Sequence, residues 1–177
     1  MEQIEKVWYA VYTKPQSEKK VTALLAKKRI ENFCPHNRVI TGYGSKRRMV
    51  YEPLFPTFVF VHINEAEMNE VRKTGDVLNF VYWLGKPAVI KTAEIENIAH
   101  FNGMYYNIQV EKSAVNSAGI IRITNEPVLT TGSGIMSLKT AKIKLTLPSL
   151  GFTMRAETEN EVTSSFEYRV QNTEAFI

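Results

Sequence analysis

Two prolines, Pro53 and Pro56, stand just before the apolar run FVFV at residues 58–61. A proline has no N–H to give to a β ladder, so both residues are expected to precede a strand that begins near Thr57. The lead-in between them is apolar too, because a leucine and Phe55 fill it. The pattern predicts a stiff apolar segment that runs into a strand, and it raises the question of what that segment contacts.

Residues 1–101 show strand and helix patterns in alternation. In chain order the spacing predicts a strand over 7–12, a helix capped by Thr13 and Gln16, a hairpin around residues 42–45, the strand from Thr57, a short helix over 65–72, a strand over 77–83 and a helix capped by Thr92. This order indicates an α+β domain with helices beside a sheet.

The chain changes character after residue 101. Residues 102–118 keep no sustained period and are predicted to be a linker. Residues 119–177 hold short β-rich runs broken by prolines and glycines, which is typical of a small β-barrel, here with a C-terminal extension from Thr158. A domain of about 60 residues is marginally stable alone, so we expect the first domain or a partner to support it.

The cysteine and hydropathy patterns indicate a reducing compartment. The single cysteine, Cys34, excludes an internal disulfide, and the three histidines are too scattered for a zinc site. No apolar stretch approaches the roughly 20 residues of a membrane span, and the N-terminus has no apolar run long enough for a signal peptide. We therefore expect a cytoplasmic protein with no membrane association, no metal and no cofactor.

The residue pattern gives no positive evidence for an enzyme. His36, His62 and His100 lie far apart, no serine stands in a G-x-S-x-G motif, and Asp76 is the only aspartate. Cys34 is interpreted as a buried small hydrophobe in preference to a reactive thiol. We expect no catalytic residue, and an enzyme of unknown type is the least supported alternative.

Positive charge is concentrated in the first part of the chain. Residues 1–101 carry 15 Lys and Arg against 11 Asp and Glu, whereas residues 102–177 carry 7 of each. Such asymmetry is typical of a segment that faces a polyanion. Chance scatter over a solvated surface explains an excess of four charges about equally well.

Several motifs then occur in a characteristic order: Trp8-Tyr9, the basic stretch at 18–21, EPLFPTFVFV at 52–61, Val71-Arg72, Gly75, Phe80-Val81, Pro87 and residues 90–95. Together they resemble the N-terminal domain of NusG-type transcription elongation factors, an α/β sandwich built on an antiparallel sheet. The EPLFP form is closer to the specialised paralogues, RfaH and the UpxY-like antiterminators of capsule loci. Residues 121–134 resemble an SH3-like KOW barrel, although Glu126 stands where glycine is usual.

The resemblance implies a docking surface for RNA polymerase. In this family the N-terminal domain places an apolar patch on the clamp helices of the polymerase and bridges the cleft over DNA. The predicted polymerase-binding residues are Tyr12, Phe55, Pro56, Phe58 and Trp83. Prolines in the lead-in would lower the cost of ordering these aromatic side chains. The aromatic residues also fit the core of an α+β sandwich, and the sequence leaves that alternative open.

Basic residues form a second group that the resemblance places near the DNA of the transcription bubble. They are Lys14, Lys46, Arg47, Arg48, Arg72 and Lys73, at a helix entry, a hairpin tip and a helix end. Taken alone, the triplet at the hairpin tip fits a solvated surface as well as a nucleic-acid contact. The His-Thr-Thr stretch with which RfaH touches the other side of the cleft has no match around Met68.

The resemblance implies a monomeric antiterminator that holds the polymerase clamp closed and suppresses pausing or termination in specific operons, capsular polysaccharide loci among them. Clamp closure would act by shifting a conformational equilibrium without chemistry. Two alternatives stay open. One is a general NusG-like factor whose second domain contacts ribosomal protein S10 or Rho, and the other is a KOW-type protein that binds RNA or the ribosome.

Overall fold

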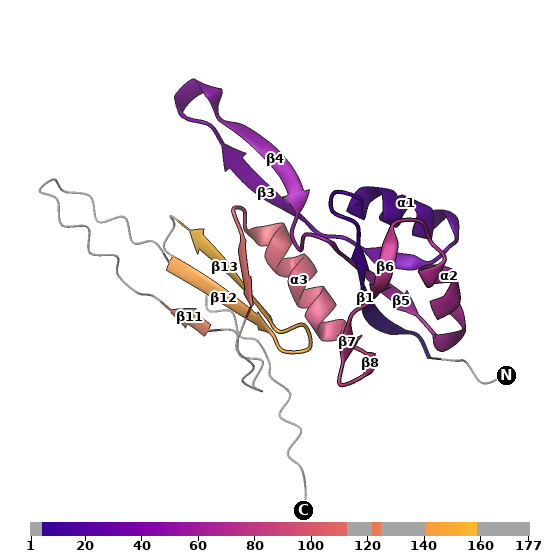
Figure 1. Ribbon diagram of the computed structural model, residues 1–177. Coiled ribbons are helices and arrows are strands. Elements are labelled where there is room, and N and C mark those ends of the chain that lie inside the picture. The colour runs from indigo at the N-terminus through magenta and orange to yellow at the C-terminus, as the bar shows by residue number, and fades with distance from the viewer. Residues whose placement is uncertain (1–4, 113–121, 125–140, 159–177) are drawn as a thin grey trace, which may run out of the picture.

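The structure is a computed structural model that describes residues 5–112, 122–124 and 141–158 (Figure 1). Its elements in the first part are β1 (Val7–Thr13), α1 (Glu18–Lys27), β2 (Glu31–Phe33), β3 (His36–Thr41), η1 (Gly44–Lys46), β4 (Arg48–Pro53), β5 (Phe58–Ile63), η2 (Glu65–Glu67), α2 (Met68–Arg72), β6 (Val77–Phe80), β7 (Tyr82–Trp83), β8 (Lys86–Pro87), β9 (Val89–Ile90) and α3 (Thr92–Met104). They are followed by β10 (Gln109–Lys112), β11 (Arg122–Thr124), β12 (Ala141–Leu147) and β13 (Phe152–Thr158).

The first sheet is antiparallel and has β1 at its centre. Its order is β2-β5-β1-β6, and β9 also pairs with β1. Almost every position of β1 is apolar and buried, so the strand needs cover on both faces of the sheet. Helices α1 and α2 cover one face, where Tyr9 and Val11 pack against Val21, Leu25 and Val71.

Helix α3 covers the other face of the first sheet and separates it from a second sheet (Figure 1). Trp8 and Phe60 of the first sheet share one hydrophobic core with Ile98 of α3 and with Leu145 and Met154 of the second sheet. A surface helix usually has one apolar face, but α3 contacts apolar side chains of a sheet on each of two sides. The elements stack as helices, sheet, helix and sheet.

The second sheet is antiparallel, in the order β10-β13-β12-β11. The predicted barrel is described only as this four-stranded sheet, because residues 113–121, 125–140 and 159–177 lie outside the described residues. The predicted linker over 102–118 contains the last turn of α3 and strand β10, which pairs with β13. The sequence pattern did not predict β10, because Ile108 and Val110 pack on the core but their neighbours in the sequence show no strand or helix period.

Two of the expected helix caps do not form. Thr13 ends β1 and its hydroxyl donates to the Lys14 carbonyl, so α1 begins at Glu18 without a side-chain cap. Thr92 lies inside α3 and does not cap it. A capping box does form at η2, where the Asn64 side chain accepts from the Glu67 N–H and the Glu67 carboxylate accepts from the Asn64 N–H.

Strands β3 and β4 form a two-stranded ribbon that projects from the body of the molecule, with η1 at its far end (Figure 1). We call residues 36–53 the arm. The hairpin predicted around residues 42–45 is confirmed by this pairing. Within the described residues, no helix is long and apolar enough to cross a membrane.

Candidate functional site

The apolar segment between β4 and β5, which the two prolines mark in the sequence, folds as a tight turn over residues 55–58. The Phe58 N–H donates to the Phe55 carbonyl at 3.1 Å, and Thr57 has φ +67°. Proline at the second position and a positive φ at the third are the signature of a type II turn. Glu18 of α1 accepts the Thr57 N–H at 2.7 Å. Pro56 lies in this turn, while Pro53 ends the preceding strand.

Phe55 is buried beneath its neighbours, with 3% of its surface exposed. Its ring meets the edge of Phe60 of β5 at 5.6 Å between centroids and packs against Phe152 of β13 at 5.7 Å. Phe152 also contacts Phe58, at 5.7 Å. The second sheet therefore covers the aromatic turn, and Phe152 is a residue of this site that the sequence pattern did not identify.

Tyr12 extends the aromatic group to the surface. Tyr12 and Phe58 are cross-strand partners of β1 and β5, and their ring centroids are 4.9 Å apart. Tyr12 is 39% exposed, Phe58 is half-buried and Pro56 is exposed. Ring contacts thus connect Tyr12 to Phe58 directly and Phe58 to Phe55 through Phe152, with Pro56 between Phe55 and Phe58 in the turn. We call Tyr12, Phe55, Pro56 and Phe58 the aromatic face.

Trp83 lies apart from the aromatic face, on the small ribbon of β7 and β8. Its side chain is 61% exposed, and the neighbouring Leu84 is 90% exposed. No ring contact joins Trp83 to Tyr12 or Phe58 in the described part of the chain. The five predicted polymerase-binding residues are therefore divided between the aromatic face and this second exposed ribbon.

A polar contact also ties the second sheet to α3. The Glu94 Oε1 accepts from the Ser149 N–H at 3.2 Å and from the Ser149 hydroxyl at 2.7 Å. Glu94 is buried in the first turn of α3, where the helix dipole favours a carboxylate, and Ser149 lies in the turn between β12 and β13. The other oxygen of Glu94 has no hydrogen-bond partner among the described residues. The contact orients the second sheet against the helix.

Three of the predicted nucleic-acid-binding residues are engaged by other side chains. Lys14 pairs with Asp76 at 3.2 Å, and Lys73 lies 4.0 Å from Glu70. Arg72 donates to the Tyr82 hydroxyl and lies over the ring of Phe80, 5.3 Å from its centroid. Hydrogen bonds from Lys20 and then Lys14 hold the pKa of Asp76 below its usual value. These cations belong to surface networks of the body.

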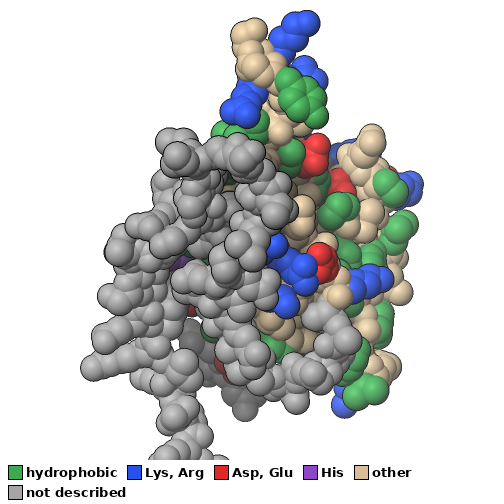
Figure 2. Space-filling view, turned by 90° about the vertical axis from the view of Figure 1, so that its left-hand side faces the viewer, with side chains coloured by type: hydrophobic (Ala, Val, Ile, Leu, Met, Phe, Trp, Pro, Cys, Tyr) green, Lys and Arg blue, Asp and Glu red, His purple; other side chains and the backbone are tan. Residues whose placement is uncertain are grey.

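The other three, Lys46, Arg47 and Arg48, lie together at the far end of the arm. All three are exposed, and none makes an ion pair with another described residue. Figure 2 shows Lys and Arg side chains gathered where the arm projects at the top of the view. The structure thus separates the predicted basic group into cations of the body that contact other side chains and cations of the arm that pair with no acidic residue in the described part of the chain.

The base of the arm is fastened to the segment between α3 and β10. The Arg38 guanidinium donates to the carbonyls of Asn102, Gly103 and Tyr105 at 2.8–2.9 Å, where α3 leaves carbonyls without helical partners. Asn37 exchanges two hydrogen bonds with the backbone of Ile108, at 2.8 and 3.0 Å. These side-chain contacts join residues far apart in the chain, and the sequence pattern gave no sign of them.

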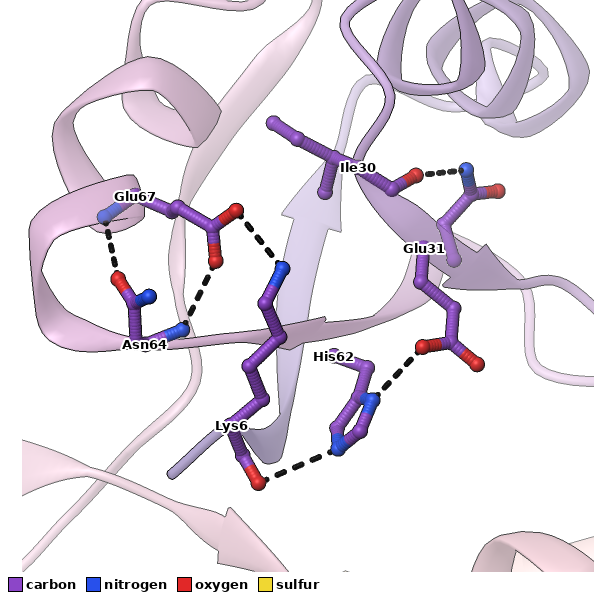
Figure 3. A network of polar contacts seen from close by, with 7 residues as sticks. Lys6, Ile30, Glu31, His62, Asn64 and Glu67 are labelled. Atoms are coloured by element: carbon purple, nitrogen blue, oxygen red, sulfur yellow. Dashed lines mark hydrogen bonds and ion pairs between the residues drawn. The ribbon is translucent and has the colours of Figure 1, made fainter. Parts of the chain in front are cut away.

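His62 takes part in a structural network at the edge of the first sheet (Figure 3). Its Nδ1 lies 2.7 Å from Glu31 Oε2 and its Nε2 lies 3.2 Å from the Lys6 carbonyl, while the ring stacks on Trp8. Lys6 also pairs with Glu67 at 2.9 Å. These partners tie the start of the chain to β2, β5 and η2.

The described residues offer no set of groups for metal or thiol chemistry. No group of three His, Cys, Asp or Glu side chains that could hold a metal occurs among them. Burial, followed by the negative charge of Glu18, raises the pKa of the Cys34 thiol to about 11, so the thiol is neutral at neutral pH. What the geometry does present is an aromatic face, an exposed ribbon and a basic arm.

Comparisons with known proteins address the family. Residues 6–99, more than half of the chain, match the family described as "NusG: Transcription termination factor nusG". The structure is similar to "Domain interaction in Thermotoga maritima NusG", with 24% identity, a TM-score of 0.46 and coverage of 87% of this chain and 93% of that chain. It is also similar to "Crystal Structure of MjSpt4:Spt5 complex conformation A", with 15% identity, a TM-score of 0.33 and coverage of 84% and 98%. No curated protein matches the chain.

Proposed function

The chain belongs to the NusG family of transcription factors, and from that membership we propose that it binds the clamp helices of an elongating bacterial RNA polymerase. Proteins of this family are transcription factors and not enzymes. Bound across the cleft, the protein holds the clamp closed and suppresses pausing or termination in specific operons. It does so as a monomer, by shifting a conformational equilibrium of the polymerase.

The aromatic face is the observation that carries this proposal. Tyr12, Phe58 and Pro56 reach the surface from two paired strands and a tight turn, so their backbone is already ordered before a partner arrives. A fully covered aromatic side chain buries about 150–250 Å², and about 25 cal/mol is gained per Å² before the costs of association. Because Tyr12 is 39% exposed and Phe58 is half-buried, docking can cover only the part that is still exposed. The two rings together then supply on the order of 2–4 kcal/mol. The exposed Trp83 ribbon supplies a second contact.

Docking of Phe55 requires the second sheet to move away. Phe152 occupies the space beside Phe55 and Phe58 that an apolar helix of the polymerase would fill. The arrangement with Phe152 in place is therefore the closed state of the protein, and the clamp helices compete with β13 for the same rings. The apparent affinity for polymerase is the affinity of the open state multiplied by the fraction of molecules that are open.

The arm supports a contact with nucleic acid of the transcription bubble. Lys46, Arg47 and Arg48 have no acidic partner among the described residues, so their charge is available to phosphates. In the proposed complex, Lys14, Arg72 and Lys73 add charge only after giving up their present partners. A general NusG-like role, with the second domain on ribosomal protein S10, and a KOW-type ribosome-binding role are the alternatives.

Capture of core RNA polymerase by the immobilised full-length protein tests the docking role. Tyr12→Ala and Trp83→Ala are expected to weaken capture by tenfold or more, the usual cost of removing an interface aromatic anchor. Trp83 is 61% exposed, so Trp83→Ala should keep its thermal stability. Tyr12→Ala also loses the ring contact with Phe58, so its thermal stability is measured alongside its capture of polymerase. Phe55→Ala is unsuitable, because removing a buried Phe costs about 3–5 kcal/mol of stability.

Tyr51→Ala is the matched control for Trp83→Ala, since Tyr51 is 59% exposed and lies on the arm. The isolated clamp-helix fragment, which carries no nucleic acid, should report the same order of affinities. Folded Tyr12 and Trp83 variants that capture polymerase as well as the Tyr51 control would reject the docking role. Capture of ribosomal subunits in place of polymerase would favour the ribosome-binding alternative.

A further inference from the structure

The arm ends in a closed turn that presents one aromatic side chain. Tyr43 is 93% exposed and lies between Gly42, with φ +89°, and Gly44, with φ +56°. A Cβ on Gly42 would collide with the Lys46 carbonyl oxygen, so only glycine allows the chain to close there. The Lys46 N–H donates to the Tyr43 carbonyl at 3.1 Å and the Arg47 N–H to the Gly44 carbonyl at 3.3 Å. The Tyr43 backbone is held while its ring meets solvent.

The charge around Tyr43 has a single sign. Lys46, Arg47 and Arg48 follow it directly, and the chain has no acidic residue between Glu31 and Glu52. Glu52 is paired in register with Asn37, next to the last residue of the arm, at its base. The far end of the arm is therefore a local concentration of positive charge, which attracts a polyanion and repels a basic partner.

The stem that carries the tip is fixed to the body. The side chains of Arg38 and Asn37 make five hydrogen bonds with the segment over residues 102–108. The Asn107 N–H donates to the Arg38 carbonyl at 2.8 Å, and the Ile40 N–H donates to the Asn107 side chain at 2.8 Å. A ribbon anchored in this way loses little freedom when its tip binds, so the contact energy of a few side chains is not spent on ordering the stem.

We propose that the tip of the arm binds single-stranded nucleic acid, with the ring of Tyr43 stacked on an unpaired base and Lys46, Arg47 and Arg48 on the flanking phosphates. This inference deepens the proposed function, on which it rests. An exposed aromatic ring among cations is the arrangement that single-strand-binding proteins use, because every base offers a face for stacking. A duplex hides those faces, so it would engage the cations alone.

Fluorescence anisotropy with the full-length protein and labelled oligonucleotides tests the proposal. The probes are a DNA single strand, the RNA of the same sequence and the matched DNA duplex. We expect the single strands to bind more tightly than the duplex, and Tyr43→Ala to weaken single-strand binding about tenfold without changing its salt dependence. Tyr43→Phe keeps the ring and should bind within about twofold of the unaltered protein.

Replacing Lys46, Arg47 and Arg48 by Ala should weaken binding of all three probes. The slope of log affinity against log salt, which is negative, should become less steep by about 2. The charge-matched control replaces Lys27, Lys86 and Lys91, which are exposed and unpaired within the described residues, and should leave that slope unchanged. Unchanged single-strand binding by a folded Tyr43→Ala variant, or duplex binding as tight as single-strand binding, would overturn the inference.

Polymerase capture separates this inference from the proposed function. The Tyr43→Ala variant should capture the clamp-helix fragment normally, because the fragment carries no nucleic acid. Failure of the Tyr12 and Trp83 variants to affect capture would reject docking and leave Tyr43-dependent strand binding standing. If Tyr43→Ala binds single strands normally while the Tyr12 and Trp83 variants lose capture, only the stacking role is rejected. The DNA and RNA probes identify which strand the tip prefers.

Discussion

Phe55 is surrounded by rings that come from different sheets, Phe60 of β5 and Phe152 of β13. The proline pattern predicted a stiff apolar lead-in at this point, and the tight turn with Pro56 agrees with it. The sequence could not predict that Phe152 covers the turn, because that contact depends on how two sheets pack and not on local spacing. At the scale of single residues, the lead-in was predictable and its neighbour was not.

Thr57 is a strained residue of this turn, since a β-branched side chain rarely adopts a φ of +67°. Thr57→Gly should stabilise the protein by about 0.5–1 kcal/mol, because relief of about 1–2 kcal/mol of strain exceeds the entropy that glycine loses on folding. The Thr57 N–H that binds Glu18 is kept. Urea denaturation measures the change. Thr57→Ala keeps the Cβ and should gain little, and a Gly variant less stable than the Ala variant would contradict the strain.

Helix and strand starts show where sequence signals succeed and fail at the scale of elements. The hairpin of the arm was predicted because glycines separate two strand patterns. The capping box expected from Thr13 failed because β1 continues through that residue. The box that forms, from Asn64 and Glu67, has the same spacing in the sequence and could have been found there. Anchoring of the arm by Arg38 had no local signal, because its acceptors are carbonyls at the end of α3.

Glu67 links this capping box to the start of the chain and gives η2 a pH dependence. The hydrogen bond from Lys6 is the main cause that lowers the pKa of Glu67 in the folded protein. A carboxylate with a lowered folded pKa stabilises the protein above its unfolded pKa, and that stability is lost as the pH falls through the folded pKa. Glu67→Gln keeps the cap but removes the charge, so it should cost about 0.2–1 kcal/mol at pH 7.

Thermal denaturation of both proteins between pH 7 and pH 3 measures this contribution. The stability difference between the unaltered protein and Glu67→Gln should shrink as the pH falls below about 4.5, the ordinary range of a Glu carboxyl. Lys6→Met removes the same ion pair from the other side and serves as the matched variant. A difference that stays constant across the pH range would show that the Lys6 contact does not stabilise η2.

At the scale of the whole molecule, α3 belongs to both halves of the protein. Its residues Ile98 and Phe101 share one core with both sheets, and Glu94 holds the turn between β12 and β13. The sequence predicted two domains from a change in residue pattern after residue 101. The described residues form two larger sheets that share one core across α3, and the division into domains stays a prediction. The sequence could not predict that the sheets meet across α3, because the contact uses apolar positions that would equally fit two separate cores.

This packing gives the closed state a measurable energy. Phe152→Ala removes the ring that covers Phe55 and Phe58, so it should raise the population of open molecules and tighten binding to the clamp-helix fragment. Each 1.4 kcal/mol lost from closure is worth up to tenfold in apparent affinity while the closed state dominates. Arg155→Ala is the control on the same strand, since Arg155 is exposed and pairs with Glu111 of β10 at 3.0 Å.

Titration of the fragment against the full-length variants measures the effect, and hydrogen exchange at the Phe58 amide reports opening independently. Faster exchange together with tighter binding in Phe152→Ala, and neither change in Arg155→Ala, is the expected pair of results, because one ring both seals the turn and competes with the polymerase. If Phe152→Ala opens the turn but leaves affinity unchanged, then the clamp helices and β13 do not share the aromatic face. Docking would in that case have to use the Trp83 ribbon alone.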